Sequence, residues 1–574
     1  MKKIYLLLVC LACAMTACAP KQGGTDAEFD AFKNRFINAL WQQYPEWGVS
    51  VGYYKNAAIL TVPDAKERAA SLTFIQKYAD SLHQFGVAGL SPNNQCDYKM
   101  LDNYFEKTRW ETNEFKEYTW NPANYNVAEG LNELLIKPYD KLPKRLADIN
   151  ARLAKVSDYY AAAKANCTNP TRQHTELAVQ QHGGTADIFK LIADSAKFAK
   201  TTDLDANLAK ARTAVADYVA FLNAKLADKN TQFKPFAIGK ALFDKKFGYD
   251  IVSEYTPDQM YEKATKHKGE LHAKMTQITR QIWQKHMGST PQPADSIVMV
   301  KMLIDKLSLQ HTKAADFVQT IRAQIPALTK FVADKKLLTL DPTQPLQVRE
   351  SPKYMRGSAG ASISSPGPYE KNGTTFYNVD PMDAADGWTP ERAESYLREY
   401  NDYILQILNV HEAIPGHYAQ LVYSNRAPSM VKTLFGNGAM IEGWAVYTER
   451  MMLEEGYGNN APEMWLMYYK WNLRSTCNTI IDIGMQTKGM TKEQVLDLLQ
   501  NSAFQTQAEA EGKYRRATLS QVQLCSYFTG FSEIYDFRES LKAKQKGQFD
   551  LKKFHETFLS FGSAPVKYVK VLMQ

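Results

Sequence analysis

Apolar residues recur at intervals of three and four positions along most of the chain. Two clear runs are Phe29, Phe32, Phe36, Ile37 and Leu40, and Leu146, Ile149, Leu153, Val156, Tyr159 and Tyr160. This spacing gives each helix one apolar stripe that can pack against a core. Short breakers such as Asn169-Pro170 and the segment 288–293 separate the runs. The pattern predicts a mainly α-helical protein.

One region departs from helical spacing. Residues 337–381 are rich in Pro, Gly, Ser and Thr, and contain short alternating pieces such as 346–349. Residues 374–379 are typical of a strand. We therefore expect a small sheet directly before a long helix. An edge strand of such a sheet can pair with an extended peptide, which makes Asn378 a candidate substrate contact. A purely structural sheet is the equal alternative.

The amino terminus has the features of a secretory signal. Lys2 and Lys3 precede a short apolar run, and the small pair Thr16-Ala17 stands directly before Cys18. This arrangement is similar to a bacterial lipobox, which implies a signal peptide over 1–17 and lipidation of Cys18. Residues 18–27 then form a lipidated, flexible tether. An ordinary signal peptide with a coincidental cysteine is the alternative. We expect an exported protein that is lipid-anchored to a bacterial membrane.

The charge and amino-acid composition of the chain argue against several classes of function. The 574 residues carry a formal charge of +8, which falls to about +6 without the signal, and basic residues are interspersed with acidic ones. We therefore expect no nucleic-acid partner. No later segment is long and apolar enough for a membrane span. The remaining cysteines form no CxxC pair, so we expect buried free thiols rather than a thiolate zinc site; they are Cys96, Cys167, Cys477 and Cys525.

The segment from Pro390 to His411 has helical spacing and ends in the sequence His-Glu-Ala-Ile-Pro-Gly-His over 411–417. In zinc-peptidase helices two imidazoles bind the metal and the glutamate between them activates water. In the ordinary HExxH motif the two histidines are four residues apart and share one helix face. Here they are six apart, about 600° around an ideal helix, which places them on different faces.

Pro415 and Gly416 offer a solution to this spacing. Pro415 cannot donate a hydrogen bond to the carbonyl of His411, so the helix must kink or widen. Gly416 tolerates backbone conformations that other residues resist. We therefore predict a local break that brings His417 beside His411. The alternative for the motif is a helix with a satisfied core histidine and two ordinary acids.

A zinc site with three protein ligands needs one more donor. Glu442 is the best candidate, because it lies in an apolar, helix-like stretch where a buried carboxylate needs a partner. Glu449 is seven residues further on the same face and could orient a ligand histidine. A surface carboxylate near Arg450 is the equal alternative for Glu449.

The other histidines lack this context. His555-Glu556 has no second histidine nearby, and we interpret His267 and His272 as surface residues. His174 and His182 flank a loop and are weak candidates.

At these motifs the chain resembles the bacterial domain-of-unknown-function family 885, related to the thermolysin-like zinc peptidases (gluzincins). The signature HExxPGH is met at 411–417, and EGWAxYxE is met at 442–449. Residues 482–484, 488–494 and 523–527 are similar to later family blocks. The motifs cover about 365–540. Gln486 stands where the family has a histidine, and Gln521-Val522 replaces Pro-Gly, which puts substrate contacts and loop shape in doubt.

The resemblance implies a two-lobed metallopeptidase-like fold, with a helical lobe over 28–336 and a catalytic lobe over 337–574. It also implies Zn²⁺ held by His411, His417 and Glu442, with Glu412 as general base for a zinc-activated water. Tyr527 is expected to donate a hydrogen bond to the oxyanion, with a buried structural tyrosine as the alternative. Gln523 is a candidate substrate or supporting contact.

The predicted function is hydrolysis of peptide bonds, most readily of short peptides. One alternative is a non-catalytic exported lipoprotein that binds peptides or glycans and keeps a relic metal site. Intact Glu412 argues against it, since a relic has no need of a general base. Another is a zinc hydrolase of esters or non-peptide amides, which would use the same centre.

Overall fold

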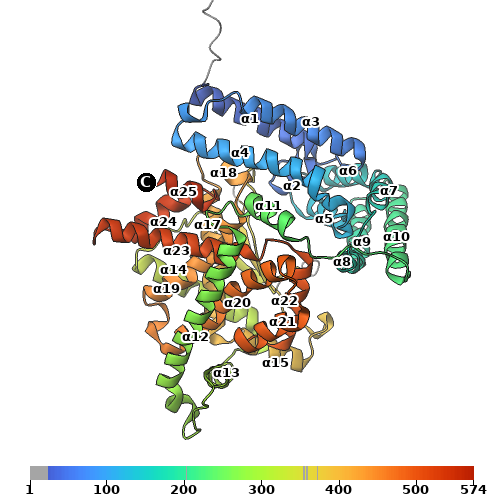
Figure 1. The fold of residues 1–574 in the computed structure, drawn as a ribbon. Coiled ribbons are helices and arrows are strands. Elements are labelled where there is room, and N and C mark those ends of the chain that lie inside the picture. Colours follow the sequence, from blue (N-terminus) through green and yellow to red (C-terminus); the bar gives the residue numbers. More distant parts are fainter. Residues whose placement is uncertain (1–22, 202, 353–355, 357–359, 371–372) are drawn as a thin grey trace, which may run out of the picture.

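The computed structural model describes residues 23–201, 203–352, 356, 360–370 and 373–574. Within these residues the protein is mainly helical with a small three-stranded sheet, as the apolar spacing predicts (Figure 1). Cys18 and the predicted signal peptide lie outside the described residues. No helix in the described part of the chain has the length and apolarity to cross a membrane.

The first helices form one end of the molecule and one flank (Figure 1). The chain is helical from Asp26, so the predicted tether over 18–27 is wrong in its last two residues. Thr25 caps this helix, and Glu28 completes a capping box. The helices are α1 (Asp26–Gln43), α2 (Pro45–Ser50), α3 (Ala65–Leu82), α4 (Pro92–Trp110), α5 (Ala128–Ile136), α6 (Leu142–Leu153), α7 (Val156–Asn166), α8 (Arg172–Gly183), α9 (Thr185–Phe198) and α10 (Asp205–Ala227).

Buried side chains fall into two clusters. The smaller cluster is formed mainly by α5–α10, with residues such as Leu131, Ile149 and Tyr218. The larger joins α1, α3 and α4 to the rest of the chain, including α11 (Lys240–Asp250), α12 (Pro257–Met287), α13 (Ser296–Leu307) and α14 (Phe317–Asp334). The predicted lobe boundary at 336–337 stays a prediction, and the main core continues across it.

The sheet has the strand order β1-β3-β2, with β1 (Leu346–Glu350) parallel and β2 (Ala361–Ser364) antiparallel to β3 (Thr375–Val379). The predicted strand at 374–379 is therefore the central strand. Both of its edges are paired, so it cannot accept a substrate backbone, whereas β2 is an edge strand and lies beside α16 (Asp402–Glu412).

The remaining helices follow the sheet in the chain, and some of them contact α16. The expected continuous helix over 390–411 is wrong, because Asn401 accepts hydrogen bonds from the backbone of Tyr403 and Ile404 and so caps a new helix. These helices are α15 (Pro390–Glu399), α17 (His417–Ser424), α18 (Met430–Leu434), α19 (Gly438–Glu454), α20 (Pro462–Thr487), α21 (Lys492–Asp497), α22 (Gln507–Leu519), α23 (Cys525–Gln545), α24 (Leu551–Ser560) and α25 (Val566–Leu572).

Two glycines allow α19 and α23 to pack in direct backbone contact. A Cβ at Gly443 would lie 2.3 Å from the carbonyl carbon of Gly530, and one at Gly530 would lie 1.7 Å from the carbonyl oxygen of Ala439. Since Glu442 precedes Gly443 and Tyr527 is one turn before Gly530, this close packing brings the two side chains near each other.

The four cysteines within the described residues are buried and free, which confirms the thiol prediction.

Candidate metal centre

The helix that carries His411 ends at Glu412, and a new helix begins at His417. Between them the backbone hydrogen bonds widen: Ile414 N donates to Asn409 O at 3.2 Å, and Gly416 N donates to Val410 O at 3.0 Å. Pro415 has no N–H to continue the α-helical pattern. The predicted break is therefore confirmed.

Gly416 is required by close packing at this break. A Cβ there would lie 1.8 Å from the carbonyl oxygen of His411 and 2.4 Å from that of Val410. The tight turn folds the chain back, so the ring centroids of His411 and His417 lie 4.8 Å apart at an interplanar angle of 87°. His411 and His417, which are six residues apart in the sequence, therefore share one site.

Glu442 on α19 completes a set of three converging donors. Its Oε2 lies 3.8 Å from Nε2 of His411 and 3.5 Å from Nε2 of His417. Ligand atoms about 2.1 Å from a tetrahedral zinc ion are about 3.4 Å from one another. The measured separations are close to this value, and two imidazoles with one carboxylate are ordinary zinc ligands. The residues present therefore fit a zinc ion.

Glu412 lies beside these donors. Its carboxylate and the ring nitrogens of His411 and His417 all lie within 4.8 Å of one another, so it could replace Glu442 as a ligand. We assign the ligand role to Glu442, which contacts both imidazoles at Nε2. Burial raises the pKa of Glu412, and the histidines offset this only in part. A raised pKa suits a general base.

Glu449 holds His411 from behind. It is fully buried, so the surface alternative is excluded, and its Oε1 lies 2.7 Å from Nδ1 of His411. Trp471 Nε1 donates to the same oxygen at 3.0 Å. Burial lowers the pKa of His411, but the contact with Glu449 and the neighbouring carboxylates outweigh it and raise the pKa to about 9. The contact leaves Nε2 facing Glu442.

Replacing Glu449 with Gln should weaken zinc binding by roughly 10- to 100-fold, because a carboxylate behind a ligand histidine fixes the ring and raises its basicity. Competition with a chelator measures the dissociation constant. Glu511→Gln, an exposed change on α22, is the matched control and should leave zinc affinity unchanged. Equal affinity of the two variants would contradict the assignment.

Tyr527 lies near Glu442. Burial raises the pKa of the Tyr527 hydroxyl most, and the negative charge of Glu442 raises it next. Arg516 donates hydrogen bonds to its hydroxyl at 3.0 Å and to Oε1 of Gln523 at 2.8 Å. Arg516 therefore bridges Tyr527 and Gln523, and the roles expected for these two residues stay predictions. Sequence reasoning missed Arg516, which carries no motif and is recognised only by these contacts.

Asn378 is not a free substrate contact. Its Nδ2 donates to Ser364 Oγ at 2.8 Å, and its Oδ1 accepts from Arg349 at 2.7 Å, so its polar atoms bind the two neighbouring strands. The residue before it, Tyr377, is buried and donates to Oδ1 of Asn409 on α16 at 2.9 Å. Because side chains alternate along a strand, Tyr377 rather than Asn378 contacts the helix of the centre.

The other histidines have structural partners. The surface interpretation of His267 and His272 is wrong: both are partly buried and bond Asn472 Oδ1 and Ser502 O. His174, His182 and His555 are buried with backbone or tyrosine partners. Gln486 accepts from Ile238 N and donates to Ala517 O.

Asp482 on α20 has a buried carboxyl group that faces the start of α23. Its Oδ2 accepts from Leu524 N at 3.2 Å, and Oδ1 has no hydrogen-bond partner among the described residues. Burial raises the pKa of Asp482 to about 7, although the hydrogen bonds to its carboxylate lower the pKa in part. Because its unfolded pKa is near 3.8, the unfolded state loses this proton first as pH rises.

The free energy of unfolding should therefore fall between about pH 4 and 7 by up to ~4 kcal/mol from Asp482, at ~1.4 kcal/mol per pKa unit. The Asp482→Asn variant should lack this contribution, so its stability relative to the parent should rise with pH over that window. Urea unfolding at pH 4.5, 6 and 7.5 measures the difference. A difference independent of pH would contradict the prediction.

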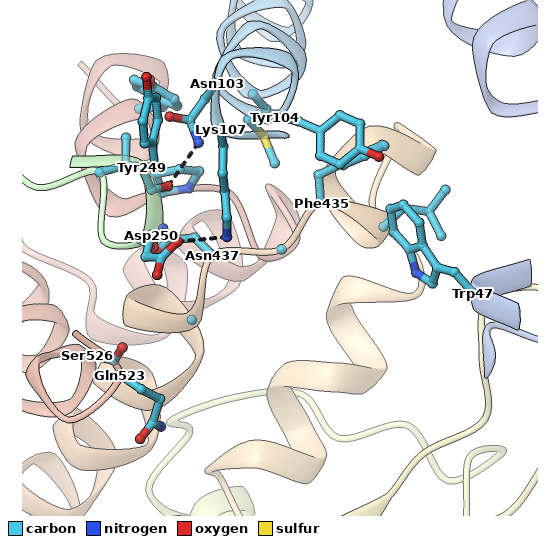
Figure 2. A pocket seen from close by; sticks show the side chains of 17 residues that line it. Trp47, Asn103, Tyr104, Lys107, Tyr249, Asp250, Phe435, Asn437, Gln523 and Ser526 are labelled. Atoms are coloured by element: carbon cyan, nitrogen blue, oxygen red, sulfur yellow. Dashed lines mark hydrogen bonds and ion pairs between the residues drawn. The ribbon is translucent and has the colours of Figure 1, made fainter. Parts of the chain in front are cut away.

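A cavity of about 370 Å³ adjoins this region (Figure 2). Gln523 and Ser526 line one side, and Tyr104, Phe435 and Trp47 line another. Gly438 also lines it and is one turn before Glu442 on α19, so both share a helix face about 6 Å apart. The cavity therefore approaches the candidate centre to within one helical turn, and none of His411, Glu412, His417 and Glu442 is among the residues that line it.

Fold and site define a mainly helical protein with a partly buried His-Glu-His-Glu cluster at a helix break. The model of the family described as "bacterial protein of unknown function (DUF885)" matches residues 45–573. The chain belongs to this family. The match extends well beyond the motif region at 365–540 and includes most of the amino-terminal half.

Two solved structures are similar. One is a "putative lipoprotein of unknown function" from Shewanella oneidensis, 49% identical, with a TM-score of 0.85, covering 95% of this chain and 99% of that chain. The other is a "putative lipoprotein" from Colwellia psychrerythraea, 16% identical, with a TM-score of 0.78, covering 95% and 97%; it shows likeness of fold alone. A comparison with curated proteins found no significant match.

Proposed function

We propose that this protein is a zinc-dependent hydrolase of peptide bonds, with His411, His417 and Glu442 as metal ligands. The observation that carries the proposal is the convergence of Glu442 Oε2 on both imidazoles, at 3.8 and 3.5 Å, across a helix break. The side chains of the three ligands are 10%, 13% and 22% exposed, so solvent and a substrate can reach the site.

His411, His417 and Glu442 would hold the zinc ion, which would supply Lewis-acid activation of water and of the scissile carbonyl. Glu412 accepts a proton from the attacking water and returns it to the leaving amine. Glu449 holds the ring of His411 through Nδ1. Tyr527 is placed to donate to the developing oxyanion, and Arg516 donates to its hydroxyl oxygen and so fixes its position.

The same proposal includes the finer features of the resemblance. We assign the fold to a two-lobed, gluzincin-like metallopeptidase, with β2 as the edge strand that pairs with an extended substrate. We also propose export and lipid anchoring through Cys18, which the 49% identical structure from Shewanella oneidensis, described as a putative lipoprotein, supports.

An exported peptide- or glycan-binding protein with a relic metal site is the second candidate. Glu412, which is partly buried and has a raised pKa, favours the hydrolase, because pure binding has no use for a desolvated carboxyl beside the metal. Hydrolysis of an ester or non-peptide amide would use the same residues, so substrate trials need to include both.

The test is metal analysis of the purified protein together with mass-spectrometric mapping of a peptide library after incubation. We expect about one zinc per chain, peptide cleavage, and loss of cleavage on chelation that added zinc restores. Parallel ester substrates distinguish the bond class. Stoichiometric zinc with no cleavage of any library would favour the binding protein, and a protein unable to bind zinc would exclude both candidates.

A further inference from the structure

Lys513 on α22 is a buried cation that the proposed mechanism does not use. Lys513 is only 5% exposed, and it forms no hydrogen bond or ion pair with any described residue. Burial of an ammonium group without an anion is unfavourable, so such groups are usually paired. The position therefore suggests a site for an anion from outside the chain.

Two more cations crowd this lysine. Burial and the charges of Arg474 and Arg516 hold the pKa of Lys513 well below its ordinary value, and Glu509 offsets them only in part. Arg474 has its own carboxylate partner, Glu509, at 3.1 Å. Among the described residues, the hydrogen-bond acceptors of Arg516 are the uncharged side chains of Gln523 and Tyr527. The cluster of Arg474, Lys513 and Arg516, named here the cation cluster, thus brings three basic side chains together with one carboxylate, which Arg474 already pairs.

The cation cluster borders the candidate metal centre through Arg516. This residue donates to Tyr527, and its charge lowers the pKa of Glu442, although burial raises it. Gln523, which accepts from Arg516, also lines the cavity beside α19 (Figure 2). An anion at the cation cluster would therefore lie close to a substrate at the centre.

A second line of contacts runs through α20. Arg474 lies 5.1 Å from the ring of Trp471, and Trp471 donates to Glu449, the partner of His411. The cluster thus adjoins the centre along two independent routes.

We propose that the cation cluster binds the free C-terminal carboxylate of a peptide whose scissile bond lies at the metal centre; this inference rests on the proposed function. Ammonium and guanidinium groups recognise carboxylates through charge-assisted hydrogen bonds. Arg516 borders the centre through Tyr527, and Lys513 lies about 4.5 Å from Arg516 along α22. One extended peptide residue spans about 3.5 Å, so one or two residues of a bound peptide would fit between the scissile bond and the terminal carboxylate. On this proposal the protein is an exopeptidase that releases one or two residues from the carboxyl end.

The test compares two pools of N-acetylated tetrapeptides with randomised residues, one with free C-terminal carboxylates and one amidated. Binding is measured by affinity-selection mass spectrometry on zinc-loaded Glu412→Gln protein, and cleavage is measured on the parent protein. Free-acid peptides should bind and be cleaved roughly 10- to 100-fold better, the effect of one charge-assisted hydrogen bond. Cleavage should fall one or two residues from the carboxyl end.

Lys513→Met removes the ammonium and keeps the length of the side chain. The variant should lose the preference for free acids, while its melting temperature in the absence of peptide should be unchanged or higher, because an unpaired buried charge is removed. Arg515→Met is the matched control, since Arg515 is on the same helix but contacts Gln180 of α8. It should keep the preference.

Equal binding of amidated and free-acid peptides overturns the inference, as does a Lys513→Met protein that keeps the preference or is strongly destabilised. Selective binding of amidated peptides that contain Asp or Glu would assign the cluster to an acidic side chain and overturn the terminal assignment. Selective binding of free acids without cleavage by the parent protein supports the carboxylate site and refutes the peptidase proposal. The two failures are therefore distinguishable.

Discussion

Glu412→Gln should reduce peptide hydrolysis by about 10²- to 10⁴-fold, the usual contribution of a positioned general base. Gln has nearly the same shape as Glu but cannot accept the proton of the attacking water. The change leaves His411, His417 and Glu442 in place, so zinc should still bind with unchanged stoichiometry. Steady-state kcat and metal content of the same protein preparation measure both effects.

The control for this variant is Glu391→Gln, an exposed acid in the first turn of α15. It should retain full activity and full zinc content. If Glu412→Gln hydrolysed peptides at the parental rate, the proposed mechanism would lose its base. If the variant lost zinc as well as activity, Glu412 would instead be a metal ligand, which its position within 4.8 Å of both histidines allows.

Gly416→Ala should remove zinc binding and destabilise the fold by about 3 kcal/mol or more, the upper range for forced overpacking. The new Cβ would lie 1.8 Å from the carbonyl oxygen of His411, and the nearest atoms are backbone, which cannot rotate away. The chain must open at this break, which moves His417 away from His411. Urea unfolding and zinc titration measure the two effects.

Gly512→Ala provides the comparison for that variant. Gly512 is exposed in α22, and its Cβ would meet no atom within 4 Å. This change should stabilise the helix by up to about 1 kcal/mol and leave zinc binding intact. Equal stability of the Gly416→Ala and parental proteins would show that the break does not depend on the missing side chain.

The helical class and most site residues are predictable from local patterns. Apolar spacing indicates helices because one face must meet a core, and it does so wherever the helix is amphipathic. Spacing does not locate Asn401, whose cap divides the segment before His411 into two helices. Chemistry-bearing motifs identify His411, Glu412, His417 and Glu442, since few other roles require these side chains together.

Contacts between distant segments are not predictable in this way. Asn378 lies in the predicted strand, yet its neighbours Arg349 and Ser364 are determined by strand order. Arg516 and Lys513 read as ordinary surface charges of a helix. Only the packing of α22 against α20 and the hydrogen bond from α22 to α23 show that one is bound to Tyr527 and the other is buried without a hydrogen bond or ion pair among the described residues.

The sequence by itself determined the helical class, the chemical identity of the candidate ligands, and the need for a break between His411 and His417. Those properties depend on residue type and local spacing, which are given by the amino-acid sequence itself. The tertiary structure alone decided that Glu442 meets both imidazoles, that Glu449 stands behind one of them, and that β3 is central. These depend on how separate helices and strands pack, through contacts such as that between Gly443 and Gly530.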